Sequence, residues 1–143
     1  MPLRSMDDIF VGSLMTSPVT TVAADTPAKA AATEMLAEGI SSVVVVDDDN
    51  QLEGILTSTD FVAIAAADHS AESVSVADYM TTDIVTTTVN ESIQDVADRF
   101  IEHGIHHVPV VAGDDGVVGM VTTTDLTAYL SGSIDSDFGR AWT

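Results

Sequence analysis

Two short stretches of the sequence combine hydroxyl and carboxylate side chains at the same spacing: GILTSTD at residues 54–60 and GMVTTTD at residues 119–125. A carboxylate beside a helix start can accept hydrogen bonds from the two vicinal hydroxyls of a ribose, and the free N–H groups there favour a phosphate or another anion. Gly54 and Gly119 would let a ring or a backbone approach closely. The Thr-x-x-Asp spacing is equally typical of a helix N-cap, so the residues alone favour neither interpretation.

The two stretches belong to an internal repeat. Shifted by 65 residues, the sequence aligns with itself without a gap from Val11 to Thr127. Identical pairs occur throughout the alignment, as where Gly39-Ile40 falls on Gly104-Ile105. One copy of Thr-x-x-Asp would decide little, but its repetition predicts that the same element occurs in a duplicated unit.

Each copy predicts the same order of elements. A short extended piece (19–22 and 84–87) precedes a helix that begins at Asp25-Thr26-Pro27 or Asn90-Glu91-Ser92 and ends at Gly39 or Gly104. Two strands follow, at 41–47 with 52–57 and at 106–112 with 117–122, and a second helix begins at Ser58 or Thr123. Pro109 has no N–H, so we expect it at an edge or at the start of its strand.

The predicted fold class is therefore α/β (α+β), built from two β-α-β-β-α units. A unit of about 55 residues is too small to bury its own sheet well. We therefore expect the two copies to pack sheet to sheet with approximate two-fold symmetry.

The composition limits the classes of function. A formal net charge of −19, with four basic residues, disfavours direct binding to nucleic acid. The absence of cysteine excludes thiolate chemistry and cysteine metal sites. No stretch approaches the roughly 18 apolar residues of a membrane span, and the first residues do not resemble a signal peptide, so we expect a cytoplasmic protein. The acidic excess resembles that of proteins from salt-rich cytoplasms, which predicts a halophilic archaeal source. The alternative is an ordinary acidic protein from a low-salt cytoplasm.

The unit resembles the CBS domain, a family named after cystathionine beta-synthase whose members occur in tandem pairs. The resemblance rests on the Met-Thr pairs at 15–16 and 80–81, the VPVV strand at 108–111, and the Gly-apolar-apolar-Thr-x-x-Asp stretches. It divides the chain into an N-terminal segment (1–10), repeat 1 (11–70), repeat 2 (75–131) and a C-terminal tail (132–143).

The resemblance implies two clefts between the repeats that bind adenosine-containing ligands such as AMP, ADP, ATP or S-adenosylmethionine. Carried over residue by residue, it assigns to the first cleft Thr57, Asp60, Asp83, Ile84, His106 and His107. It assigns to the second cleft Thr122, Asp125, Pro18, Val19, Ser41 and Ser42.

The implied clefts differ in charge. His106 and His107 can carry part of a positive charge near neutral pH, whereas Ser41 and Ser42 offer hydroxyls only. Neither cleft gains a lysine or an arginine from the matched positions, which disfavours a triphosphate and favours AMP, adenosine or S-adenosylmethionine. We expect no required cofactor. The family further implies a homodimer that signals to a regulated partner protein.

Two other classes of function stay open at this point. A ligand-free dimerisation scaffold would need Thr-x-x-Asp only as a helix cap, and a small nucleotide hydrolase would use Asp60 or Asp125 with a histidine. We expect that the protein is not an enzyme. We also expect no metal site, because Gly104 separates His103 from His106 and His107. Trp142, beside Phe138 in the tail, would suit either a loose end or a dimer contact.

Overall fold

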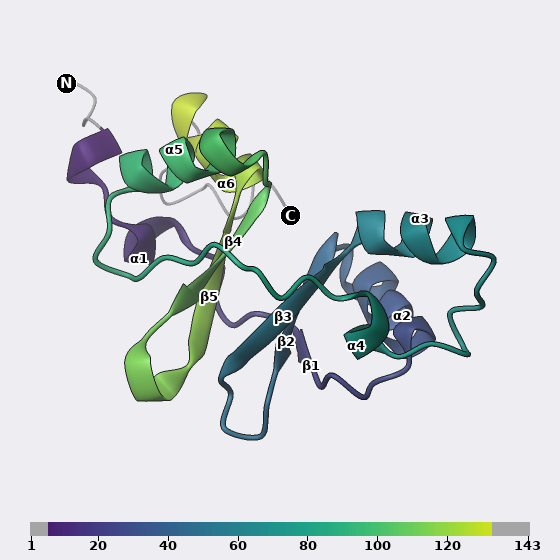
Figure 1. Ribbon diagram of the computed structural model, residues 1–143. Helices are drawn as coiled ribbons and strands as arrows, with labels where there is room; N and C mark the ends of the chain where they lie inside the picture. Colours follow the sequence, from purple (N-terminus) through teal and green to yellow (C-terminus); the bar gives the residue numbers. More distant parts are fainter. Residues whose placement is uncertain (1–5, 133–143) are drawn as a thin grey trace. The chain divides into compact units, whose positions relative to one another are not determined.

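The computed structural model describes residues 6–132, in which the chain forms two compact units (Figure 1). Unit 1 contains residues 6–17, 85–110 and 119–132, and unit 2 contains residues 18–84 and 111–118. Each unit mixes helices and strands, as the predicted fold class requires. Among residues 6–132, no helix has the length and apolar character that crossing a bilayer demands.

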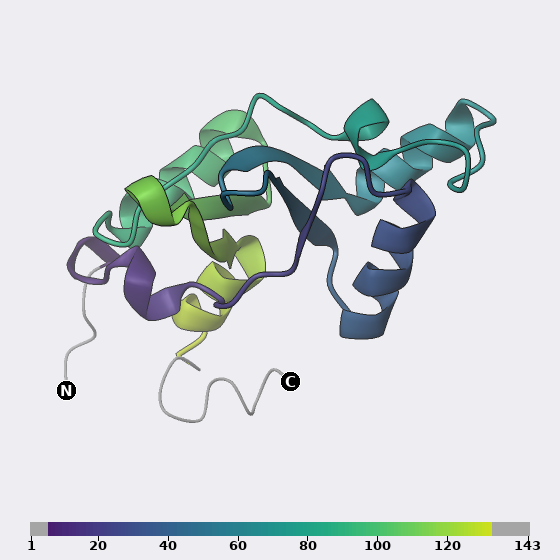
Figure 2. The same cartoon turned by 90° about the horizontal axis from the view of Figure 1, so that it is seen from below.

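Unit 2 contains a three-stranded sheet formed by β1 (Thr21–Val22), β2 (Ser42–Val46) and β3 (Leu52–Thr57). The strand β2 is central, parallel to β1 and antiparallel to β3. The helices α2 (Ala28–Glu38) and α3 (Ser58–Ala66) lie on one side of these strands, as Figure 2 shows. The core of unit 2 joins the sheet to α2 and to α4 (Val76–Tyr79) through buried Val43, Val45, Leu56, Met35 and Val76.

Unit 1 contains η1 (Met6–Asp8), α1 (Val11–Leu14), α5 (Ile93–His103) and α6 (Thr123–Leu130). It also holds most of the antiparallel hairpin formed by β4 (His107–Val111) and β5 (Val117–Thr122). Pro109 lies in the middle of β4, on an edge strand of this two-stranded sheet, rather than at the strand's start. The Pro109 carbonyl oxygen accepts from the Thr87 N–H at 3.0 Å. The Pro109 nitrogen, which carries no hydrogen, faces the same side of β4, where an isolated bridge is the only pairing among residues 6–132.

The predicted helix limits are confirmed in both copies. The helices α2 and α5 begin after Pro27 and Ser92 and end at Gly39 and Gly104, whose φ angles of 65° and 62° place both in the left-handed region. A glycine adopts this region without steric cost, which allows it to close the helix. The second helices begin at Ser58 and Thr123, as expected.

The compact units do not coincide with the repeats, because the Met-Thr segments are exchanged. Thr16, from the first segment, pairs with Met120 of β5 in unit 1, and Thr81, from the second, pairs with Ile55 of β3 in unit 2. Each antiparallel bridge has both of its N–H···O bonds, between 2.8 and 3.0 Å for Thr16 with Met120 and between 2.9 and 3.0 Å for Thr81 with Ile55. Segments of one repeat thus complete strand pairing in the other.

Two turns meet within unit 2. Asn50, with a φ of 63°, donates from its side-chain amide to the carbonyl oxygens of Asp115 and Val117, at 2.9 Å in each case. Gly116 lies so close that a Cβ atom there would overlap the carbonyl oxygen of Asn50. The η2 turn (Gly113–Asp115) of the second hairpin is therefore bound to the turn of the first.

Candidate functional site

The first Thr-x-x-Asp lies where β3 ends and α3 begins. The Thr57 N–H donates to Asp60 Oδ2 at 2.7 Å, and the Thr57 hydroxyl lies 3.4 Å from the same oxygen. Thr57 is the N-cap of α3 and Asp60 is its third residue, which is the capping-box arrangement. The sequence signature of a helix cap is therefore confirmed in repeat 1.

The second Thr-x-x-Asp repeats this geometry where β5 ends and α6 begins. The Thr122 N–H donates to Asp125 Oδ2 at 2.8 Å, and the Asp125 N–H donates to Thr122 Oγ1 at 3.3 Å. In both caps the N–H donates to Oδ2, and Oδ1 accepts no hydrogen bond from any of residues 6–132. A carboxylate can accept through both of its oxygens, so the cap leaves one oxygen of each aspartate for another donor.

The two aspartates differ in burial. Asp60 is half-buried, whereas only 9% of Asp125 is exposed. Burial raises the pKa of Asp125, and the hydrogen bonds with Thr122 oppose this effect only in part. The repeated motif therefore places a carboxylate in two different environments.

Two predicted site residues of unit 2, Ser41 and Ser42, lie close to Thr57. Ser42 pairs with Thr57 across β2 and β3, and the carbonyl oxygen of Ser41 accepts from the Ser58 N–H at 3.0 Å. Pro18 and Val19 lead into β1, and exposed Asp83 and half-buried Ile84 follow Thr81. The resemblance assigned Ser41 and Ser42 to the cleft of Asp125, in the other unit, and that assignment stays a prediction.

In unit 1, the histidines lie at the start of β4, next to the cap of α6. The Thr123 N–H donates to the carbonyl oxygen of His106 at 3.1 Å. Burial lowers the pKa of His107, and the charge of His106 lowers it further. Burial therefore favours the neutral form of His107, because desolvation disfavours the imidazolium. The expectation that these histidines contribute positive charge to a ligand site stays a prediction.

Gly54 and Gly119 serve the packing of methionines. A Cβ atom on Gly54 would lie 2.6 Å from Met80 Sδ and 3.1 Å from the carbonyl oxygen of Thr81. On Gly119 it would lie 2.5 Å from Met15 Sδ. The close approach expected at these glycines is confirmed, but the group that approaches is the Met-Thr segment of the other repeat rather than a ligand ring.

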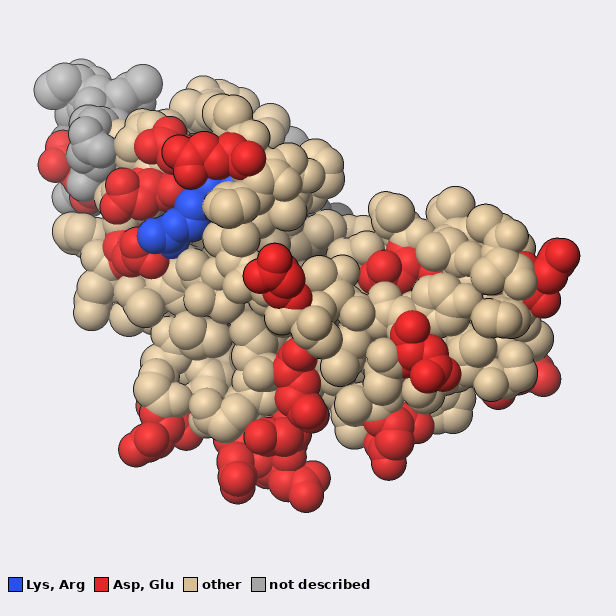
Figure 3. Space-filling view, viewed as in Figure 1, with Lys and Arg blue, Asp and Glu red and all other residues tan. Residues whose placement is uncertain are grey.

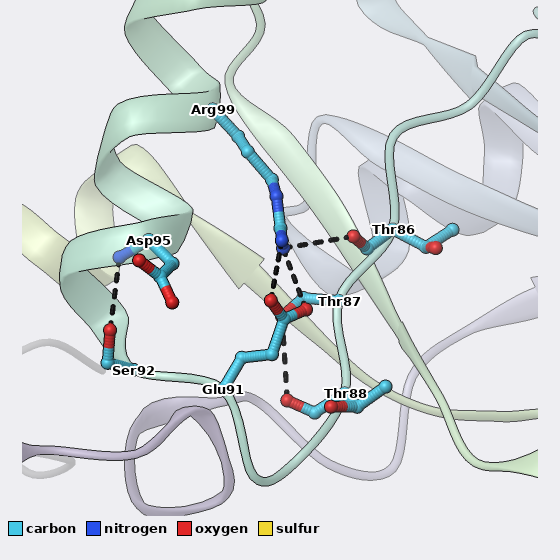
Figure 4. A network of polar contacts seen from close by, with 7 residues as sticks. All are labelled: Thr86, Thr87, Thr88, Glu91, Ser92, Asp95 and Arg99. Carbon is cyan, nitrogen blue, oxygen red and sulfur yellow. Dashed lines mark hydrogen bonds and ion pairs between the residues drawn. The ribbon is translucent and has the colours of Figure 1, made fainter.

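The sequence-based reasoning missed an ion pair that fixes residues 86–91 to α5. The Arg99 guanidinium donates to both carboxylate oxygens of Glu91, at 2.8 and 2.5 Å, and to the carbonyl oxygen of Thr86 at 3.3 Å (Figure 4). Because the chain has so few basic side chains, an acidic partner could have been sought for each of them. The spacing of eight residues between Glu91 and Arg99, however, gives no local signal of their pairing.

Positive charge among residues 6–132 is already paired. Lys29 bonds Glu72 at 2.6 Å, and Arg99 bonds Glu91. Acidic side chains are distributed over both units on the face shown in Figure 3, where the visible Lys and Arg atoms lie among them. Within the described part of the chain, no three His, Asp or Glu side chains are placed to hold a metal ion. Phe138 and Trp142 lie outside the described residues.

The sequence pattern of the CBS domain family matches residues 11–67 and 76–132, which together make up most of the chain. The chain belongs to the CBS domain family. The prediction of a tandem CBS pair is thus confirmed, while the exact limits drawn for its repeats stay a prediction.

CBS relatives include both small proteins and parts of larger ones. An uncharacterized 17.7 kDa protein of Acidianus ambivalens is 30% identical, over 91% of this chain and 78% of that protein. Homoserine O-acetyltransferase of Methanococcus vannielii is 28% identical over 85% of this chain, which spans a quarter of that enzyme's length.

Solved structures are similar to this chain over nearly their whole length. The CBS domain pair of protein MJ0100, in complex with 5′-methylthioadenosine and S-adenosyl-L-methionine, has a TM-score of 0.80 and 27% identity, and the match covers 86% of this chain and 96% of that one. A putative acetoin utilization protein of Vibrio cholerae has a TM-score of 0.78 and 27% identity, covering 87% and 91%.

Proposed function

We propose that this CBS pair is a regulatory module that binds an adenosine-containing ligand and signals its presence to a partner protein. The observation that carries the proposal is the pair of caps in which Asp60 and Asp125 each keep Oδ1 unbonded among residues 6–132. Such an oxygen can accept from a ribose hydroxyl while Oδ2 maintains the cap. The similarity to the MJ0100 pair, solved with two adenosine compounds, supports this ligand class.

The proposed ligand residues are those that the family resemblance implies. One site would use Thr57, Asp60, Asp83, Ile84, His106 and His107. The other would use Thr122, Asp125, Pro18, Val19, Ser41 and Ser42. In both sites the aspartate would bind the ribose, and the early-strand residues would contact the adenine.

The paired cations limit the charge of the ligand. Lys29 and Arg99 are both bonded to glutamates, and burial favours the neutral form of His107. Several phosphate groups would therefore find little positive charge to offset their own. We infer that S-adenosylmethionine, 5′-methylthioadenosine or AMP binds more tightly than ATP, with no catalysis and no required cofactor.

We also propose that a second copy covers exposed apolar side chains on the helices. Leu36 on α2 and Ile101 on α5 occupy equivalent positions of the repeats and are 85% and 82% exposed. Large apolar side chains exposed at equivalent positions favour a symmetric contact, which supports the homodimer. The acidic surface supports a salt-rich cytoplasm as the setting.

Calorimetric titration in molar salt tests the ligand proposal. We expect S-adenosylmethionine or 5′-methylthioadenosine to bind, and Asp60→Asn or Asp125→Asn to weaken binding at least tenfold. Asp78→Asn is the matched control, because Asp78 forms a third capping box by accepting from the Ser75 N–H at 2.9 Å and is not a proposed ligand residue.

Three outcomes would contradict the proposal. The absence of binding heat from the wild-type protein would favour the dimerisation scaffold. Equal weakening by Asp78→Asn would mean that the caps act only through stability. Conversion of a nucleotide during long incubation, detected by chromatography, would favour the hydrolase instead.

A further inference from the structure

The first strand of repeat 1 has only a partial counterpart in repeat 2. In unit 2, Thr21 and Val22 of β1 pair with Val44 and Val45, and the Val44 N–H donates to the carbonyl oxygen of Thr20 at 3.2 Å. The equivalent of Val44 in repeat 2 is Pro109, which has no N–H to donate. Only the single bridge between Thr87 and Val110 remains there.

A side-chain network takes the place of the missing ladder. Arg99, on α5, binds the Glu91 carboxylate with two nitrogens and the carbonyl oxygen of Thr86 with one of them (Figure 4). The Thr87 hydroxyl donates to Glu91 Oε1 at 2.9 Å, and Thr87 is only 1% exposed. The Arg99 and Glu91 side chains are 28% and 29% exposed, so solvent screens their pairing less than it screens an exposed pair.

The anchored segment lies next to proposed ligand residues. Thr86 follows Ile84 by two residues, and Asp83 precedes Ile84 directly. In repeat 1 the corresponding Pro18 and Val19 lead into β1, which the backbone ladder holds. The two stretches proposed to contact adenine are thus held by different kinds of bond.

We propose that Arg99 and Glu91 are positioning residues for the ligand site that contains Asp60, Asp83 and Ile84. The inference rests on the proposed function. By fixing Thr86 and Thr87, the ion pair limits the conformations of Asp83 and Ile84 before the ligand arrives. Preorganisation of this kind raises affinity without a direct contact to the ligand. The site of Asp125, with Pro18 and Val19, does not depend on the ion pair.

The test compares Arg99→Gln and Glu91→Gln with Lys29→Gln. Lys29→Gln removes the same charge as Arg99→Gln but breaks an exposed ion pair in unit 2, whose side chains are 61% and 68% exposed. Titration with 5′-methylthioadenosine in an Asp125→Asn background isolates the site of Asp60, and an Asp60→Asn background isolates the other. Amide hydrogen exchange of residues 85–88 without ligand reports the anchor itself.

We expect Arg99→Gln and Glu91→Gln to speed exchange of the Thr87 amide at least tenfold and to weaken binding at the site of Asp60 about tenfold. Lys29→Gln and the site of Asp125 should be unchanged. The charge-swapped double variant Arg99→Glu with Glu91→Arg should recover part of both losses. If Arg99→Gln does not fold, Arg99→Lys keeps the charge but not the two-nitrogen contact, and its effect should be intermediate.

The outcomes separate this inference from the proposed function. Absence of 5′-methylthioadenosine and S-adenosylmethionine binding by the wild-type protein would overturn the proposed function, and the positioning role with it. Binding by the wild-type protein that Arg99→Gln, Glu91→Gln and Arg99→Lys leave unchanged would overturn only the positioning role. Equal weakening at both sites would also overturn it, because that result indicates a general loss of stability.

Discussion

Repeat 1 and repeat 2 hold their first segments with different bonds, and the segment forms a strand in repeat 1 and only an isolated bridge in repeat 2. In repeat 1 a backbone ladder attaches β1 to β2, and in repeat 2 a bridge and the Arg99–Glu91 ion pair attach the equivalent segment. The caps and the glycine helix ends recur almost unchanged in both copies. The fold therefore requires that the first segment be held in place, and the sequence of each copy determines which bonds hold it.

The largest expected effect comes from imposing the proline of one repeat on the other. Val44→Pro removes the N–H that bonds Thr20 on the central strand β2 and should lower the free energy of unfolding by about 3 kcal/mol or more. Pro109→Val restores an N–H to β4 and should raise it by up to about 1 kcal/mol. Urea denaturation measures both, and equal effects of opposite sign would contradict the asymmetry between the two repeats.

A smaller loss should follow when a methyl group is placed on either strand glycine. Gly54→Ala and Gly119→Ala would displace Met80 and Met15, and each should cost about 1–3 kcal/mol. Met80→Ala should relieve the loss caused by Gly54→Ala and not the loss caused by Gly119→Ala. Double-mutant cycles check this specificity, and an absence of coupling would contradict the packing of Met80 on Gly54 and of Met15 on Gly119.

The ion pair predicts a pH dependence that belongs to repeat 2. The hydrogen bonds from Arg99 hold the pKa of Glu91 below its ordinary value of 4.5. The folded state then binds the proton less readily than the unfolded state, so the contribution is present above about pH 4.5 and is lost as pH falls through the folded pKa. Glu91→Gln should cost about 1–2 kcal/mol near pH 7 and progressively less toward pH 3.

Denaturation at several pH values, in constant salt, measures this difference. Lys29→Gln serves as the comparison and should change the free energy of unfolding by less than about 0.5 kcal/mol throughout. A cost of Glu91→Gln that does not vary with pH would show that the carboxylate stabilises the segment by packing rather than by charge.

The smallest effects should be equal in the two repeats. Gly39→Ala and Gly104→Ala each place an alanine at a left-handed helix end with no atom within 4 Å of the new Cβ, so only backbone strain acts. Each should cost about 1 kcal/mol. Thermal denaturation compares them, and a difference well beyond that value would mean that the two helix ends are not equivalent.

Some features of the candidate site could be predicted from the sequence, and others could not. Thr57, Asp60 and their copies were found because a strand end, a cap and a helix start lie within a few residues of one another. The sequence could not tell that Gly54 packs on Met80, because 26 residues separate them. The sequence also could not predict that Asp125 is more buried than Asp60, because burial depends on distant parts of the chain.

The sequence by itself determined the repeat, the order of the helices and the two strands between them in each copy, the helix limits and the two caps. These features depend on hydrogen bonds and backbone preferences over at most a few residues, and the 65-residue repetition exposed them twice. The extended piece predicted at 84–87 forms only a single bridge, because Pro109 has no N–H to complete a ladder. Only the tertiary structure decided which segments are exchanged, how Asn50 joins the two turns, and where Arg99 finds Glu91. Those contacts depend on the path of the chain between residues that have no local reason to meet.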